Sequence, residues 1–243
     1  MNSPDPGTGN DELNGGAAIS ARSIWAVGSR QQGTGPTGTL IEHWNGTRWR
    51  SVASPDPGTG KTSSVLYAVA AGSARQAWAV GGDSLSGGRV LALRWNGARW
   101  SVSKAANPHR GSPALSSVTA TSARSALAVG TISGPGKGQV RTLAEKWTGS
   151  VWSILPTPAP AGGARLYAVA ARDRDYAWAV GSIGYLWRKT LAEHWDGRTW
   201  TQVPAPSPSP IDNLLSAVTA IPGRGGFLAI GGAGPGGLVE QNC

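Results

Sequence analysis

Cysteine is nearly absent from this sequence of 243 residues, since the only one is Cys243, the last residue. A single thiol excludes an internal disulfide framework and zinc sites built from several cysteines. Histidine is also scarce, with three residues, and no Asp-rich loop of the kind that binds Ca²⁺ is present. The sequence therefore predicts no metal site and no cofactor.

Long apolar runs are missing as well. No window approaches about 18 consecutive apolar residues, the length of a membrane-spanning helix. The first residues, MNSPDPGTGNDE, contain neither the basic nor the apolar segment of a secretory signal. We therefore expect a soluble chain with no transmembrane segment and no export signal in this sequence.

Charged residues make up only 14% of the chain, but 22 are basic and 13 acidic, a formal net charge of +9. A basic chain attracts polyanions, so nucleic acid, acidic glycans and anionic membranes are possible partners. Alternatively, the Ala-, Gly-, Pro- and Arg-rich composition reflects a GC-rich coding sequence. No run of five or six basic residues forms a binding tail.

Glycine, proline and tryptophan are abundant, with 36, 17 and 12 residues, and they belong to a repeat. Each repeat opens on a leucine, and successive leucines are 53, 49, 51 and 49 residues apart. A period near 50 residues is typical of a propeller or a solenoid. The opening residues are Leu13, Leu66, Leu115, Leu166 and Leu215.

Each of the first four repeats contains four short β-type runs, as in LYAVAA (66–71), AWAVG (77–81), VLALRW (90–95) and ARWSV (98–102). None has the length or period of a helix. An Asn-Gly or Asp-Gly pair at 45–46, 96–97 and 196–197 predicts an antiparallel hairpin between the last two runs, because these residues tolerate positive φ. Four antiparallel strands per repeat are the composition of a propeller blade.

The predicted fold is therefore all-β, a single β-propeller domain over residues 1–243 with about five four-stranded blades, the fifth incomplete. The blades span residues 13–65, 66–114, 115–165 and 166–214, with a partial blade at 215–243. Residues 3–9 repeat residues 54–60, so residues 1–12 could complete the partial blade. Either the ring is closed loosely by that segment, or the chain is a piece of a longer array. An unclosed ring exposes strand edges, which predicts self-association.

The small residues of the first run favour the innermost strand, where blades crowd around the central channel. Tryptophans recur in the later runs, where a Trp between two blades buries roughly 200 Å². We expect eleven of them to form the core: Trp25, Trp44, Trp49, Trp78, Trp95, Trp100, Trp147, Trp152, Trp178, Trp195 and Trp200.

Loop lengths differ between the two faces of such a disc. The links between runs one and two and between runs three and four are short and nearly invariant. The links between runs two and three and between blades vary in sequence, and in an up-and-down blade they emerge together on the opposite face. Variable loops on a rigid scaffold are the expected place for binding.

The pattern LxAVAAxSAxxAWAVG, followed by TLxEHWNGTxW and an SPxPG linker, resembles tandem propeller repeats common in secreted or surface proteins of actinobacteria and related filamentous bacteria. The resemblance covers nearly the whole chain and implies an extracellular or cell-envelope location. Gly81-Gly82 is loosely similar to a kelch repeat, and 196–200 to an Asp-box hairpin. The chain departs from the repeat family's usual Asp two residues before the second-strand Trp, where it has Ser23, Gln76, Ser125 and Tyr176.

Catalytic residues are hard to find in this pattern. A hydrolase needs paired carboxylates or a nucleophile with its base. Four glutamates occupy one repeat position on the third strand, and His43 and His194 share the next, so we interpret both sets as structural. The glutamates are Glu42, Glu145, Glu193 and Glu240.

Four arginines follow the opening leucine by nine residues and would form a ring on the short-loop face. Such a ring could bind an acidic partner, or it could consist of solvated turn residues. Nucleic acid is an unfavoured partner, because the tryptophans are committed to the core. The ring consists of Arg22, Arg75, Arg124 and Arg224, with Arg174 one place early in blade four.

The strongest feature outside the repeat is the run from Tyr185 to Lys189. Trp187 is the one tryptophan outside the repeat positions, and an exposed cluster of Tyr185, Trp187 and Arg188 could bind a sugar or a protein. Alternatively, the third strand begins early and buries Trp187. His109 and Arg110, in a variable linker, are further candidates.

We therefore predict a non-enzymatic binding module whose variable-loop face holds a carbohydrate or protein ligand. The alternatives are a propeller glycoside hydrolase or polysaccharide lyase, and a platform for polyanions.

Overall fold

The computed structural model describes residues 3–4, 6–58, 62–83, 88–136, 138–223 and 225–242, with side chains for all of these but Asn242. These residues form 19 strands in five antiparallel sheets, which confirms the predicted all-β propeller. Among them, no helix is long and apolar enough to cross a membrane.

Each sheet consists of strands in sequence order. The first contains β1 (Glu12–Ser20), β2 (Ser23–Gln31), β3 (Thr37–Trp44) and β4 (Trp49–Ser51). The second contains β5 (Ser64–Ser73), β6 (Gln76–Asp83), β7 (Arg89–Trp95) and β8 (Trp100–Val102). The third contains β9 (Ser112–Ser122), β10 (Ser125–Ser133), β11 (Val140–Trp147) and β12 (Trp152–Leu155). The fourth contains β13 (Ala164–Asp173), β14 (Tyr176–Ile183), β15 (Lys189–Trp195) and β16 (Trp200–Val203). The fifth contains β17 (Asn213–Ala220), β18 (Phe227–Ala233) and β19 (Gly236–Asn242).

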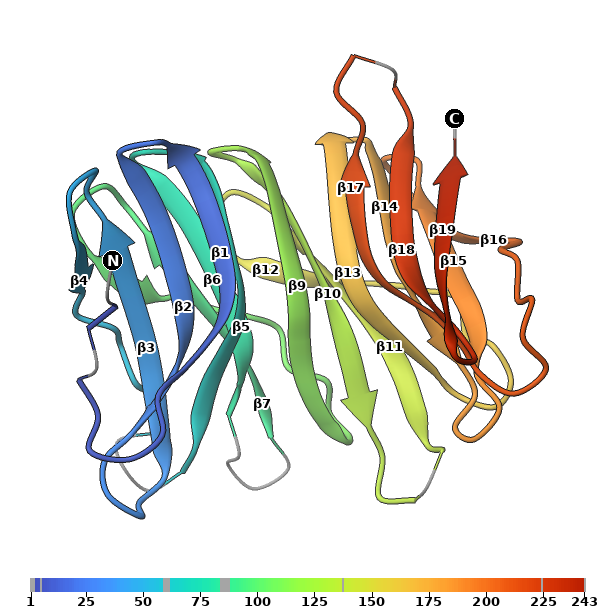
Figure 1. Cartoon of the computed structure of the whole chain (residues 1–243), viewed down its shortest axis with the longest axis horizontal. Helices are drawn as coiled ribbons and strands as arrows, with labels where there is room; N and C mark the ends of the chain where they lie inside the picture. The colour runs from blue at the N-terminus through green and yellow to red at the C-terminus, as the bar shows by residue number, and fades with distance from the viewer. Residues whose placement is uncertain are drawn as a thin grey trace.

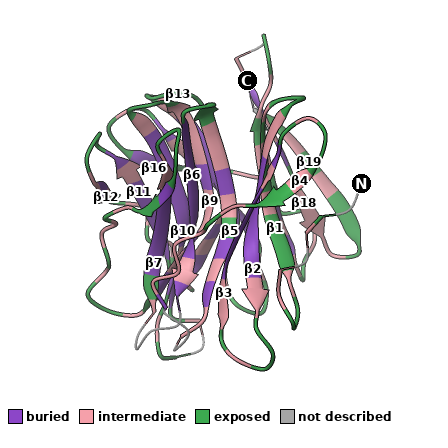
Figure 2. Cartoon of the chain, turned by 90° about the vertical axis from the view of Figure 1, so that its left-hand side faces the viewer, coloured by how far each residue is buried: buried purple, intermediate pink, exposed green. Residues whose placement is uncertain are grey.

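The sheets stand side by side in sequence order (Figure 1). The first strand of each packs against the first strand of the next, from β1 through β5, β9 and β13 to β17. These strands are therefore the inner ones, as the small side chains predicted. Buried residues lie mainly in the strands, and exposed residues lie mainly in the loops (Figure 2).

The first and fifth sheets lie at opposite ends of the row (Figure 1). The N-terminal segment lies along the first sheet, where the Thr8 and Gly9 amides donate to the Gln31 carbonyl oxygen at 3.1 and 3.0 Å. Among the described residues, β19 is the outer strand of a three-stranded sheet. Completion of that blade by residues 1–12 is not seen in this part of the chain and stays a prediction.

The last two strands of each complete sheet are joined by the predicted hairpin, whose length the sequence left open. Trp44 pairs with Trp49, so the loop comprises residues 45–48. The Asn45 side-chain oxygen accepts the amides of Thr47 and Arg48, both at 3.0 Å, while Gly46 takes φ +95°. The Asn45 side chain therefore satisfies the amides of the turn, and Gly46 supplies the positive φ that the turn requires.

A β-bulge explains the glycine that ends AWAVG. In β13 the register shifts between Leu166 and Ala168, and the same shift follows the opening leucine in the other four inner strands. The bulge brings the backbone of the inner strand β13 close to the second strand β14. A Cβ on Gly181 of β14 would therefore lie 1.8 Å from the Arg165 carbonyl oxygen. The corresponding distance is between 1.8 and 2.0 Å at Gly28, Gly81, Gly130 and Gly231. Only glycine fits at this position.

We predict that Gly181→Ala lowers the free energy of unfolding by about 1–3 kcal/mol, because the methyl group must displace backbone. Urea denaturation measures the change. Gly16→Ala is the matched control, since Gly16 is also a strand glycine but its added Cβ would meet no atom closer than 3.6 Å. Equal loss in both variants would contradict the steric explanation.

Tryptophans fill the spaces between the sheets, as predicted. Nine of the eleven repeat tryptophans are buried, while Trp49 and Trp95 are partly exposed. Trp78 of the second sheet meets Trp147 of the third with ring centroids 4.5 Å apart. The apolar core is therefore a series of layers between blades, and no single sheet could bury its own tryptophans.

Candidate ligand-binding site

The two kinds of loop emerge on opposite faces, as the up-and-down connection requires. On the short-loop face, Arg22 packs over the 45–48 hairpin, with its Cγ 2.8 Å from where a Cβ on Gly46 would lie. Arg22, Arg75 and Arg124 are exposed in equivalent turns, whereas Arg174 pairs with Asp175 at 2.9 Å. Arg224, the fourth member of the predicted ring, lies outside the described residues. A polyanion-binding role for this ring stays a prediction.

On the other face, the loop between β14 and β15 carries the predicted aromatic pair. Trp187 is 67% exposed and Tyr185 49% exposed, with Leu186 between them at 73%. Because β15 begins at Lys189, the alternative that an early strand buries Trp187 is wrong. Three consecutive large side chains therefore meet solvent on the variable-loop face.

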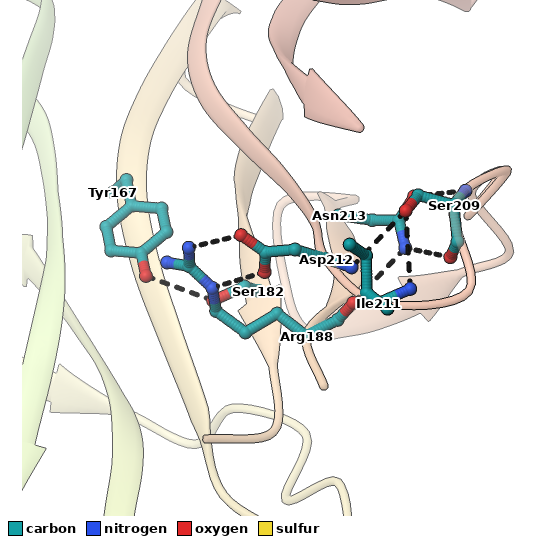
Figure 3. Close-up of polar contacts among 7 residues, drawn as sticks. All are labelled: Tyr167, Ser182, Arg188, Ser209, Ile211, Asp212 and Asn213. Carbon is teal, nitrogen blue, oxygen red and sulfur yellow. Dashed lines mark hydrogen bonds and ion pairs between the residues drawn. The ribbon is translucent and has the colours of Figure 1, made fainter. Parts of the chain in front are cut away.

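An ion pair holds this loop to the next linker (Figure 3). The Arg188 Nε and Nη2 atoms donate to the two carboxylate oxygens of Asp212, each at 2.7 Å. The interaction lowers the pKa of Asp212 and raises that of Arg188, because each charge stabilises the other. A bidentate pair of this kind fixes orientation as well as distance. The sequence placed Arg188 in the site but did not reveal its partner, which is 24 residues away.

Backbone contacts brace the same loop from both sides. The Asn213 amide donates to the Arg188 carbonyl oxygen at 2.9 Å, and the Gly184 amide donates to the Gly163 carbonyl oxygen at 2.8 Å. The Asn213 side chain in turn bonds the Ser209 amide at 2.9 Å and its carbonyl at 2.7 Å. Linkers on either side of the fourth blade therefore hold the aromatic residues in place.

A groove of about 620 Å³ lies next to this loop. It runs between the linkers of the third blade and the β10–β11 loop, and Arg110 and Arg141 line it together with Gln139. Tyr185 borders the groove, because its Cβ lies 3.9 Å from where a Cβ on Gly138 would be. His109 is exposed in the same linker as Arg110. The structure thus brings Arg110 and Tyr185 to one region, and it adds Arg141 and Gln139, which no sequence pattern distinguished.

Glu145 and Glu193 lie between neighbouring sheets and not on either loop face, whereas the Glu42 carboxylate accepts the Ser3 hydroxyl of the N-terminal segment. Glu42, Glu145 and Glu193 are fully buried. Burial raises the pKa of Glu193 to about 8, and it raises the pKa of Glu145 to about 8 despite an opposing contact from the Ala106 backbone. The His194 ring packs against Trp178 at a tilt, with centroids 5.1 Å apart, and burial lowers the pKa of His194. Within the described ranges, no three His, Cys, Asp or Glu side chains form a group that could hold a metal ion.

The raised pKa of these glutamates predicts that stability falls with rising pH. From the ordinary value of 4.5 up to about 8, the folded protein keeps protons that the unfolded chain has lost. Each group then lowers the free energy of unfolding by up to about 1.4 kcal/mol per pH unit in that window. Glu193→Gln keeps a neutral side chain, so we expect a shallower slope in urea denaturation between pH 5 and pH 8. Glu12→Gln, at an exposed site, is the control, and an unchanged slope for Glu193→Gln would contradict the assignment.

No protein-family model matches the chain, and no curated protein matches it either. Among solved structures, the chain is similar to the fungal lectin of Aleuria aurantia, a six-bladed β-propeller, with 13% identity and a TM-score of 0.54. That similarity covers 94% of this chain and 73% of the lectin.

Two further structures give the same result. YCF48 bound to D1 peptide has 13% identity and a TM-score of 0.53, over 90% of this chain and 60% of that one. SapL1 lectin in complex with α-methyl fucoside has 12% identity and a TM-score of 0.53, over 94% and 78%. The chain thus spans less than two thirds of YCF48. At these identities the similarities show the fold, a β-propeller.

Proposed function

We propose that this β-propeller is a carbohydrate-binding module whose site is the β14–β15 loop and the adjoining groove. The observation that carries the proposal is the exposure of Tyr185 and Trp187 on a loop that Arg188 and Asp212 hold in place. The Arg188–Asp212 ion pair restricts the loop that carries Trp187, so the exposed ring is held in position before a ligand binds. Preorganisation lowers the entropic cost of binding.

The chemistry of this surface suits a sugar. The apolar face of a pyranose can stack on Trp187, while ring hydroxyls need donors and acceptors such as Arg110, Arg141 and Gln139 along the groove. Arg188 acts in this proposal by positioning the loop, since two of its nitrogens bond Asp212. The lectins among the similar structures support a carbohydrate, and the peptide-bound YCF48 supports a protein ligand as the second possibility.

A binding role without catalysis agrees with the state of the acidic residues. Asp212 is engaged by Arg188, which keeps it ionised and unsuited to donate a proton. Glu193 is fully buried between two sheets, where no polymeric substrate could reach its carboxyl group. On the resemblance of its repeats, we also propose that the module acts outside the cell or on its envelope.

A glycan array with the full chain tests the proposal. We expect binding to a defined set of neutral or acidic glycans, weakened at least tenfold by Trp187→Ala, which corresponds to about 1.4 kcal/mol. Asp212→Asn should weaken binding to the same glycans, because it releases the loop. Tyr67→Ala is the matched control, since Tyr67 is an exposed aromatic residue on the inner strand β5.

Two outcomes would reject this site. Equal binding by the wild type and Trp187→Ala would remove the aromatic loop from the site. Binding only to sulfated glycans, with an affinity that falls steeply as salt is added, would favour the arginines of the short-loop face. Turnover of a bound polysaccharide would show that the module is an enzyme.

A further inference from the structure

The third blade carries positive charge with almost no acidic residues to balance it. Residues 84–172, which include the whole of this blade, contain eleven basic residues and one acidic residue, Glu145. Glu145 is fully buried between sheets, so it contributes no carboxylate to either loop face. The charged side chains in the loops and linkers of the third blade are therefore all basic.

Two of these basic residues line the groove beside the β14–β15 loop. Arg110 and Arg141 are both exposed, and no ion pair among the described residues involves either of them. The described residues that line the groove include no acidic side chain. On the same face, Asp83 and Asp212 each already bond a different arginine. The groove therefore holds two guanidinium groups whose charge no carboxylate of the described residues balances.

Both arginines are anchored to the same strand, β10. Arg141 of β11 pairs with Ile132 of β10. Gly111, which follows Arg110, lies against the same residue, because a Cβ on Gly111 would be 2.7 Å from the Ile132 Cγ2 atom. Gly111 also takes φ +89°, a conformation that favours glycine. The linker and β11 therefore flank β10, two strand spacings or roughly 10 Å apart, and long arginine side chains from both can reach one ligand.

Glycine contacts join this groove to the aromatic loop. Gly163, with φ +82°, has no room for a Cβ, because the Gly138 carbonyl oxygen of the β10–β11 loop occupies that space. The Gly163 carbonyl oxygen accepts the Gly184 amide of the β14–β15 loop at 2.8 Å. The groove with its arginines and the loop with Trp187 therefore form one surface, which can bind an anionic group and a flat apolar face together.

We propose that this surface binds a sugar that carries a carboxylate, such as a uronic acid unit of an acidic polysaccharide. The inference rests on the proposed carbohydrate-binding function and specifies the class of sugar. The carboxylate accepts hydrogen bonds from Arg110 and Arg141, since a planar carboxylate matches the fork of a guanidinium group. The apolar face of the same ring, or of its neighbour in the polysaccharide, stacks on Trp187, and Gln139 bonds the ring hydroxyls.

Charge decides between an acidic and a neutral sugar in this groove. A neutral sugar forms hydrogen bonds with the two arginines but leaves their charge unmatched. A carboxylate forms charge-assisted hydrogen bonds, which are roughly twice as strong. Because the described lining of the groove includes no carboxylate, an acidic ligand meets no like charge there. The groove therefore favours the acidic sugar.

Oligosaccharides that differ only in the group at C6 test the inference. Tetramers of galacturonate, mannuronate and glucuronate are titrated into the full chain by calorimetry, each beside the tetramer of galactose, mannose or glucose with the same linkage. We expect at least one uronate tetramer to bind at least tenfold more tightly than its neutral counterpart. Arg110→Gln and Arg141→Gln keep a hydrogen-bonding side chain but lose the charge, so each should reduce that preference at least fivefold. Arg50→Gln is the matched control, because Arg50 is an exposed arginine on the outer strand β4 and its loss changes the net charge equally.

The outcomes separate this inference from the proposed function. Equal affinity for uronate and neutral tetramers, or a preference that survives both arginine substitutions, would overturn the inference, while neutral binding that depends on Trp187 would leave the proposed function standing. An equal loss of preference in Arg50→Gln would show general attraction to a basic chain and would also overturn it. A sulfated tetramer that binds more tightly than every uronate would overturn the carboxylate assignment. Absence of binding to all three uronates rejects the inference, and absence of binding to every glycan on the array rejects the proposed function as well.

Discussion

The packing of each sheet against the face of the next is the interaction on which the rest of this structure depends. A single four-stranded blade is too small to bury its own tryptophans, so each blade uses the next as its cover. Trp25 and Trp78 are buried because the following blade places rings against them. The bulge of the inner strand and the glycine beneath it belong to the same constraint, since they set how closely the first two strands of each blade approach.

This construction leaves the loops of one face free to vary while their bases stay fixed. Linkers between blades bond the loops between second and third strands, as Asp212 and Asn213 do with Arg188. Those contacts turn separate loops into one continuous surface over the third and fourth blades. An aromatic loop and a groove with arginines can then act as a single site, although their residues lie far apart in the chain.

The same construction explains why the acidic residues do not resemble a catalytic pair. Glu145 and Glu193 of the third strand face the preceding blade, where burial raises their pKa values to about 8.

Much of the architecture could be predicted from the sequence, because hydrophobic period, turn residues and repeat length are local properties. The four strands per blade, the hairpins at Asn-Gly and the three-stranded fifth sheet all follow from patterns within about 50 residues. Only the tertiary structure decided that Trp187 is exposed, that Arg188 binds Asp212, and that Arg110 and Tyr185 border one groove. Those facts depend on which loops of different blades lie close together, and the repeat period of the sequence carries no information about such contacts.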